Sequence, residues 1–259
     1  MSNTAAVTPV DVWQASTTYF EPQVGDQFSL GYFMSFKEGK YEAFIEGFYK
    51  SVDHTLDYKD GANLILNPHP ETSLIPGKSM AYGVEFSVSR VTGRLTGSLN
   101  YTWSRSWRRT MSTFPEETIN SGDMYPSNYD QPHVVQMNWR YALSRRWSFT
   151  GTFVYHTGRP MSVPVSAYQV NHVPVMEFTA RNSHRLPDYH RLDLALVLEG
   201  NHKRRKLWDG TWTLSLYNAY ARKNAYAVFY QENGKGILQP YKLSVVGTII
   251  PSLSYGFKL

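Results

Sequence analysis

The sequence predicts an all-β fold, and within that class a transmembrane antiparallel β-barrel. Most segments alternate apolar with polar residues, which is typical of strands with two chemically different faces. Four very short turns also alternate with four long connections, a pattern typical of outer-membrane barrels. The short turns are residues 37–40, 92–94, 144–146 and the slightly longer 200–210; the long connections are roughly 58–79, 108–131, 157–187 and 220–243.

The composition agrees with a barrel. Aromatic residues make up 15% of the 259 residues, with 19 Tyr and 7 Trp, which suits aromatic girdles at two membrane interfaces. The mean hydropathy is −0.42 and no run of 18 apolar residues exists, so no helix is expected to span a bilayer. The chain has no Cys, which excludes disulfides and Cys-ligated metals. The net charge of +5 comes from scattered basic residues and indicates no nucleic-acid partner.

The segment from Leu95 to Ser104 shows the alternation best. Leu99 and its apolar neighbours at every second position are expected to face lipid, and Asn100 and the other small polar residues to face the lumen. Eight further segments repeat the pattern, so we expect nine strands. The other eight cover roughly residues 27–36, 41–50, 82–89, 135–141, 147–155, 191–198, 212–216 and 252–259.

The first residues lack features of an exported protein. Residues 1–7 have no basic stretch and no apolar core of secretory length. Since a barrel of this kind must be exported, we expect the chain to be a piece of a longer protein. The alternative is a soluble β-rich sheet, whose large apolar face would need a partner sheet or helices, and no amphipathic helical segment is evident.

Several stretches in order along the chain resemble the C-terminal barrel portion of a TonB-dependent outer-membrane receptor of the Bacteroidetes type. Two residues depart from the family pattern: Gln131 stands where Arg is usual, and Leu259 where the family closes on an aromatic residue that assists assembly. The resembling stretches are Pro22–Tyr32, Ala81–Glu85, Tyr129–His133, Leu186–Asp193, Tyr217–Asn224 and Ile250–Phe257.

The resemblance implies the last nine strands of a 22-stranded barrel with a plugged lumen. Residues 1–25 would be the remainder of an extracellular loop, and residues 26–259 the C-terminal part of the barrel. It further implies a location in the outer membrane, contact with its lipid, an N-terminal plug domain, a TonB-type energy transducer, and recognition of the last strand by the barrel-assembly machinery.

The implied function is energy-coupled uptake of a scarce nutrient. The small ligand is open among a siderophore, cobalamin, haem, a glycan and a peptide. Whether a partner lipoprotein caps the barrel is open as well. Two other functions are open alternatives. One is a structural or adhesive outer-membrane barrel that transports nothing, and the other is a soluble β-rich binding protein.

No catalytic, cofactor or metal site is expected. The sequence has no His-Glu-x-x-His motif, no phosphate-binding glycine loop and no nucleophile elbow, so we do not expect an enzyme. The loop histidines are expected to be solvated, with a role as a metal or haem ligand as the alternative; they are His54, His69, His172 and His184. The basic run His202–Lys206 is expected to be a solvated turn, with contact to acidic lipid headgroups as the alternative.

Two sets of residues are candidates for contact with solute. The first is charged and predicted to point into the lumen, where its members either line the solute path or pair with one another or with a plug: Glu42, Glu46, Glu85, Arg140, Arg191 and Asp193. The second consists of loop aromatics, which either contact a ligand or pack their own loops: Tyr168, Phe178, Tyr226, Phe229 and Tyr230.

Overall fold

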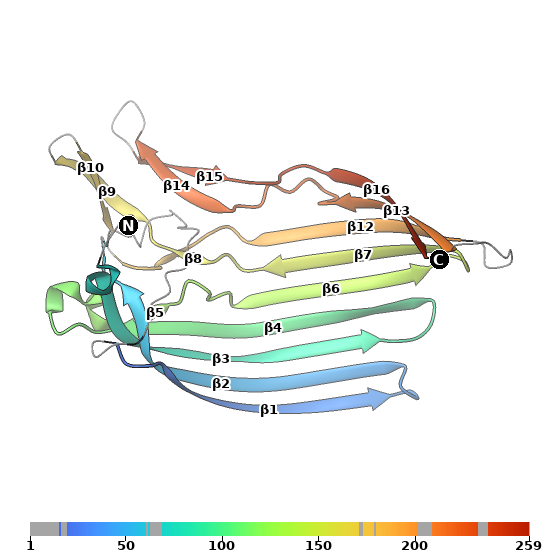
Figure 1. Ribbon diagram of the computed structural model, residues 1–259, viewed down its shortest axis with the longest axis horizontal. Coiled ribbons are helices and arrows are strands. Elements are labelled where there is room, and N and C mark those ends of the chain that lie inside the picture. The colour runs from blue at the N-terminus through green and yellow to red at the C-terminus, as the bar shows by residue number, and fades with distance from the viewer. Residues whose placement is uncertain are drawn as a thin grey trace.

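The computed structural model describes Ser16, Ala62 and residues 20–60, 69–170, 173–178, 180–200, 209–232 and 238–258. Nine long antiparallel strands form one sheet in the order β1-β2-β3-β4-β6-β7-β12-β13-β16 (Figure 1). The strands are β1 (Val24–Phe36), β2 (Tyr41–Tyr58), β3 (Leu74–Arg90), β4 (Leu95–Thr110), β6 (His133–Ala142), β7 (Trp147–His156), β12 (Tyr189–Glu199), β13 (Asp209–Tyr217) and β16 (Ile250–Lys258).

The nine predicted strands are therefore confirmed, and each pairs with the next along the sheet. Among the described residues, helical structure is confined to three short 3₁₀ segments: η1 (Pro70–Ser73), η2 (Pro115–Glu117) and η3 (Ile119–Gly122). In the described part of the chain no helix is long and apolar enough to cross a membrane. Residues 1–15 and 17–19 lie outside the described part, so the loop expected at the start of the chain stays a prediction.

The connections between the long strands lie at two opposite ends of the sheet, as Figure 1 shows. The turns at residues 37–40, 91–94 and 143–146 lie at one end, which we call the turn end. Residues 201–208 of the fourth turn, which include the basic run, lie outside the described residues. The long connections leave from the opposite end, which we call the loop end.

Two long connections are shorter than the sequence predicted. Residues 74–79 belong to β3 and residues 108–110 to β4, because Gly77 pairs with Thr110 and Leu74 pairs with Tyr58. This part of the chain lacks regular apolar–polar alternation, so the pattern missed strands that the hydrogen-bond ladder nonetheless continues. The paired strands β3 and β4 therefore extend past the alternating segments toward the loop end.

The other long connections contain small hairpins. One connection holds β9 (Pro164–Val170) paired with β10 (Val173–Phe178), and β8 (Pro160–Met161) paired with β11 (His184–Arg185). The last connection holds β14 (Ala227–Glu232) paired with β15 (Leu238–Leu243). A two-residue strand, β5 (Tyr125–Pro126), pairs with the extension of β4.

The register places apolar residues side by side across the sheet. Leu99 on β4 lies opposite Val88 on β3 and Met137 on β6, while the adjacent Asn100 lies opposite Ser87 and Gln136. Because side chains alternate between faces, the first row lies on an apolar face and the second on a polar face. Large apolar side chains on this face are exposed from β1 (Phe28, 71%) to β16 (Leu253, 65%), while those of β12 are half-buried. So large an exposed apolar surface indicates contact with a membrane or another apolar partner.

Two aromatic side chains on the apolar face cover glycines of neighbouring strands. Trp139 on β6 lies between Gly97 and Gly151, and a Cβ atom on Gly151 would overlap its indole ring. Tyr255 on β16 covers Gly210 on β13 in the same way. The absence of a glycine side chain thus makes room for flat aromatic packing on the sheet.

The two faces can be tested with a matched pair of substitutions in the complete protein. Leu99→Arg places a charge on the apolar face, at a cost of about 2–4 kcal/mol if this face contacts the middle of a bilayer. Asn100→Arg places the same charge on the polar face and should cost much less. Urea unfolding of the protein in lipid vesicles measures the difference, and equal costs would contradict the assignment of faces.

Candidate ligand-binding site

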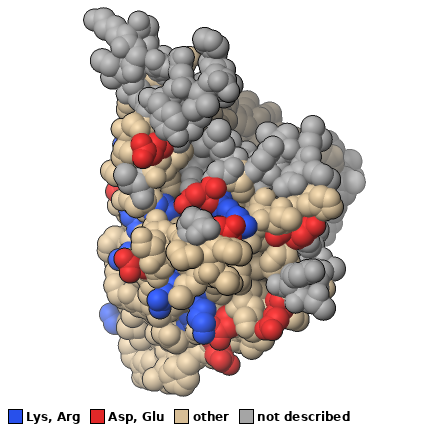
Figure 2. Space-filling model, turned by 90° about the vertical axis from the view of Figure 1, so that its left-hand side faces the viewer, with Lys and Arg blue, Asp and Glu red and all other residues tan. Residues whose placement is uncertain are grey.

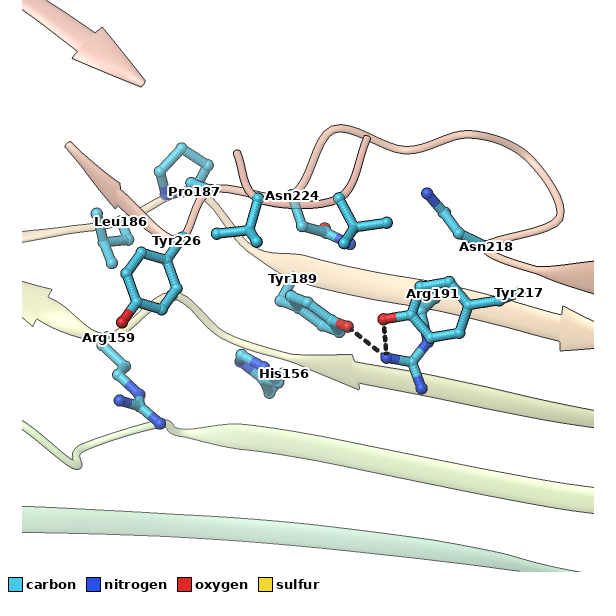
Figure 3. Close-up of a pocket in the computed structure, with 14 residues that line it drawn as sticks. His156, Arg159, Leu186, Pro187, Tyr189, Arg191, Tyr217, Asn218, Asn224 and Tyr226 are labelled. Carbon is cyan, nitrogen blue, oxygen red and sulfur yellow. Dashed lines mark hydrogen bonds between the residues drawn. The ribbon is translucent and has the colours of Figure 1, made fainter. Parts of the chain in front are cut away.

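A pocket in the described structure lies on the polar face, near the loop end of β7, β12 and β13 (Figure 3). Its volume is about 450 Å³, within the range of sites for small ligands. The lining residues are His156, Gly158, Arg159, Leu186, Pro187, Tyr189, Arg191, Tyr217, Asn218, Asn224, Ala225, Tyr226, Val245 and Val246.

The strand register builds the floor of the pocket. Tyr189 lies opposite His156, and the two rings stack with centroids 4.6 Å apart and planes 2° apart. Gln131 lies beside this pair, and its Nε2 is 2.7 Å from His156 Nδ1 and 3.2 Å from the Thr157 carbonyl oxygen. The stack therefore presents a rigid aromatic surface toward the pocket.

Arg191 forms the centre of a hydrogen-bond network (Figure 3). Its Nη2 lies 2.9 Å from an Asp193 carboxylate oxygen, and its Nη1 donates to the hydroxyls of Tyr189 (3.0 Å) and Tyr217 (2.7 Å). The Tyr217 ring also lies against the guanidinium, 4.2 Å away. Asp193 accepts a further bond from the Asn218 backbone N–H. Of the alternatives open for the predicted charged residues, Arg191 and Asp193 pair with one another, and this pair positions the pocket wall.

The turn after β13 forms the side of the pocket. Asn218 is 1% exposed, and its Nδ2 donates to the carbonyls of Arg222 (3.1 Å) and Thr248 (3.2 Å). Asn224 bridges to β12, because its side chain both accepts from and donates to the backbone of His190. These bonds hold the turn against the sheet.

Asp188, just before β12, binds the end of β7 and the segment that follows β7. Its carboxylate accepts from the Gly158 backbone N–H (2.9 Å) and the Tyr155 hydroxyl (2.8 Å). The bond from Gly158 stabilises the charged form and lowers the pKa of Asp188 below its usual value. This carboxylate is therefore an ionised structural anchor.

A buried carboxylate fixes the loop that carries Leu186 and Pro187. The Asp130 side chain is fully buried and accepts from Arg105 Nε (3.2 Å), the Ser106 backbone N–H (2.7 Å) and Arg185. Arg185 also donates to the carbonyl oxygens of Asp130 and Gly158. Charged partners thus compensate for burial of the carboxylate, and β4 is tied to β11.

A second network joins three long connections, and we call it the loop cluster: Asp57, Asp60, Arg108, Tyr125 and Arg181. The Arg181 side chain is 4% exposed and lies 3.1 Å from Asp57 and 2.6 Å from Asp60. Tyr125 donates to Asp57 (2.7 Å), and Arg108 lies 3.4 Å from the same carboxylate. Ile75 and Ile119 pack with Tyr125 as a small buried core. Figure 2 views this end and shows acidic and basic side chains interspersed.

The predicted charged residues lie on the polar face, but they do not form one site. Arg140 pairs with Glu199 at 2.7 Å, nearer the turn end. Glu46 lies directly opposite Glu85 on the neighbouring strand, and Glu42 accepts a long hydrogen bond from Ser89. Of the predicted set only Arg191 lines the pocket, with Asp193 behind it.

The predicted loop aromatics also lie in different parts of the loop end. Tyr226 lines the pocket and is 58% exposed. Phe229 stacks on Tyr241 within its own hairpin, which also carries Tyr230, and Phe178 lies at the end of β10. Nothing is described of the Tyr168 side chain.

The histidines expected to be solvated form no metal site among the described residues. His54 is exposed and lies 3.2 Å from Glu21, and His69 lies 3.1 Å from Glu71. His184 contacts the neighbouring Ser183, while His172 lies outside the described part.

Sequence reasoning missed most of the residues that build this region. Asp130, Asp188, Asn218 and Asn224 all fall within the stretches that carry the family resemblance, and that was the available signal. Arg181 falls outside those stretches, and no spacing or pattern indicated its role.

Comparison with known proteins identifies the barrel type. The family model for the β-barrel of TonB dependent receptor-like proteins matches residues 3–230. A search of curated proteins finds no match.

Three solved structures share the fold. The ferripyoverdine receptor of the Pseudomonas aeruginosa outer membrane matches with a TM-score of 0.56 and 13% identity, over 92% of this chain and 27% of the receptor. The ferric-catecholate import receptor Fiu from Escherichia coli K12 gives 0.57 and 13%, over 98% and 31%. The FrpB iron transporter of Neisseria meningitidis gives 0.55 and 12%, over 94% and 33%. The chain thus spans about a third or less of each protein.

The loop cluster should depend on Arg181. Arg181→Met removes the buried cation and leaves Asp57 and Asp60 with less compensation, which we expect to destabilise the cluster by about 3 kcal/mol. Limited proteolysis of the complete protein should then cut faster within residues 111–130 and 180–186. Arg145→Met, in an exposed turn at the other end, is the control, and equal cutting in both variants would contradict the role of Arg181.

Tyr125 should resist ionisation. Burial raises its pKa above the usual value near 10, and the charge of Asp57 adds to the shift. A pKa that is higher in the folded state means that its stabilising contribution is complete below pH 10 and declines as the pH rises further. NMR of ¹³Cζ-labelled tyrosine, assigned with Tyr125→Phe, should show a phenol at pH 11. A phenolate signal at that pH would contradict the burial.

Proposed function

Because the chain belongs to the TonB-dependent receptor β-barrel family, we propose that it forms part of the wall of an outer-membrane receptor that takes up a scarce nutrient. The family match over residues 3–230 carries the proposal. The nine-strand sheet supports it, since an apolar face suits lipid and a polar face suits a lumen.

The proposed receptor needs further strands and partners. In the described part of the chain β1 and β16 each have a single neighbour, so each leaves a row of backbone groups that lipid cannot satisfy. We infer that other strands of the receptor close these edges around a plug domain. A TonB-type transducer supplies the energy from the inner membrane, and the barrel-assembly machinery recognises β16.

The pocket lies where a solute would enter. The loop end faces the exterior in this proposal, and the pocket is on the polar face next to it (Figure 3). Tyr226 and Arg159 contact the solute, whereas Glu42, Glu46 and Glu85 line the lumen closer to the turn end. The ligand is a siderophore, cobalamin, haem, a glycan or a peptide, and the experiment below decides among them.

Transport should depend on the transducer and on the pocket. Mass spectrometry of medium solutes retained by the purified complete receptor identifies the ligand. Cells that express the receptor should then accumulate this ligand only when the transducer is active, and Tyr226→Ala should reduce accumulation about tenfold through lost ring contacts.

Tyr241→Ala is the matched control, because that ring packs in the neighbouring hairpin on Phe229. Retention of no solute, or accumulation that is independent of the transducer, would refute the proposed function. The structural or adhesive alternative would then remain.

A further inference from the structure

We propose that the pocket binds a ligand with an anionic group on an aromatic or other apolar body. This inference rests on the proposed function, because it names the class of solute that this wall of the receptor contacts. Three features of the pocket support it: its side-chain carboxylates and amides are already bonded, its open polar side chains can donate hydrogen bonds, and its remaining walls are apolar.

The side-chain carboxylates and amides near the pocket are occupied by the protein itself. Asp193 binds Arg191 and the Asn218 backbone, and Asp188 binds Gly158 and Tyr155. The amide oxygen of Asn218 accepts from the Arg222 backbone N–H. That of Asn224 likewise accepts from Arg222 and the His190 backbone. A ligand that needs several acceptors, such as a neutral sugar with many hydroxyl donors, therefore finds few here.

His156 contributes a donor. The Gln131 amide nitrogen must donate to the Thr157 carbonyl, and this orientation also directs an N–H toward His156 Nδ1 at 2.7 Å. His156 Nδ1 also lies 3.3 Å from the Thr157 carbonyl oxygen, which already accepts from Gln131, so we assign Nδ1 as the acceptor of the shorter bond and place the proton of the neutral ring on Nε2. The ring in the pocket floor thus offers an N–H to a ligand.

Arg159 supplies the charge. Its side chain is exposed at the edge of the pocket on the side of His156 (Figure 3), and the structure shows no side-chain partner for it among the described residues. Arg191 is instead neutralised by Asp193, and Arg222 donates to the Asp188 carbonyl and to Asn224. The guanidinium of Arg159 is therefore available for a bidentate bond to a carboxylate or a similar anion.

The remaining walls favour an apolar body. Leu186, Pro187, Ala225, Val245 and Val246 line the pocket together with the His156–Tyr189 stack. Apolar walls with a few convergent donors are typical of sites that orient a hydrophobic ligand through one polar group. The Tyr226 ring adds an aromatic surface at the exposed side.

Two probes of the same shape test the proposal. Equilibrium dialysis measures binding of 2-naphthoate and 2-naphthamide to the complete receptor in amphipol. We expect the anionic probe to bind about tenfold more tightly than the neutral one, and Arg159→Gln to remove this preference. Arg159→Lys should keep part of it. Arg145→Gln, which removes the same charge from an exposed turn at the other end, should bind both probes like the wild type.

Each other outcome overturns the inference. Equal binding of the two probes, binding of neither, or an unchanged preference in Arg159→Gln would refute the ligand class or its site. An equal loss in Arg145→Gln would show a general charge effect instead. A receptor that imports its solute with the transducer yet binds both probes alike would refute this inference and leave the proposed function standing.

Discussion

A single register of antiparallel pairing, maintained across nine strands, is the constraint on which the rest of this structure depends. Rows such as Val88–Leu99–Met137 stay apolar and rows such as Ser87–Asn100–Gln136 stay polar only while every strand keeps its place. A slip of one residue would exchange the faces of a strand. The apolar face can then meet hydrocarbon while the ladder satisfies the backbone, which is the condition for a sheet in a bilayer. The glycine positions beneath Trp139 and Tyr255 follow from the same register.

At the loop end the structure changes from apolar to ionic stabilisation. The connections cannot use a hydrophobic core of any size, since the buried apolar cluster described there consists of Ile75, Ile119 and Tyr125. Buried charges take its place: Asp130 accepts from two arginines, and Arg181 joins segments more than a hundred residues apart. Such networks are costly to bury and destabilising when broken, so they stabilise one loop arrangement over others.

The pocket depends on both the strand register and the charged networks of the loop end. Strand pairing brings His156 against Tyr189, and the charged networks place Leu186, Pro187 and the 218–226 segment around that stack. Because the networks occupy the carboxylates and amides, the groups that remain open are a guanidinium, an imidazole N–H and a phenol. The same bonds that stabilise the loops therefore select the chemistry that the pocket presents.

The sequence by itself determined the all-β class, the nine strands and their two faces, because these depend on local alternation. It did not determine the extension of β3 and β4, which has no regular alternation and exists through pairing alone. It also did not reveal the pocket: His156 and Arg159 come from the end of β7 and the connection after it, Tyr226 comes from the last connection, and Arg181 finds its carboxylates on β2 and the connection that follows β2. Only the tertiary structure brings such residues together, since their contacts depend on loop paths that no local pattern encodes.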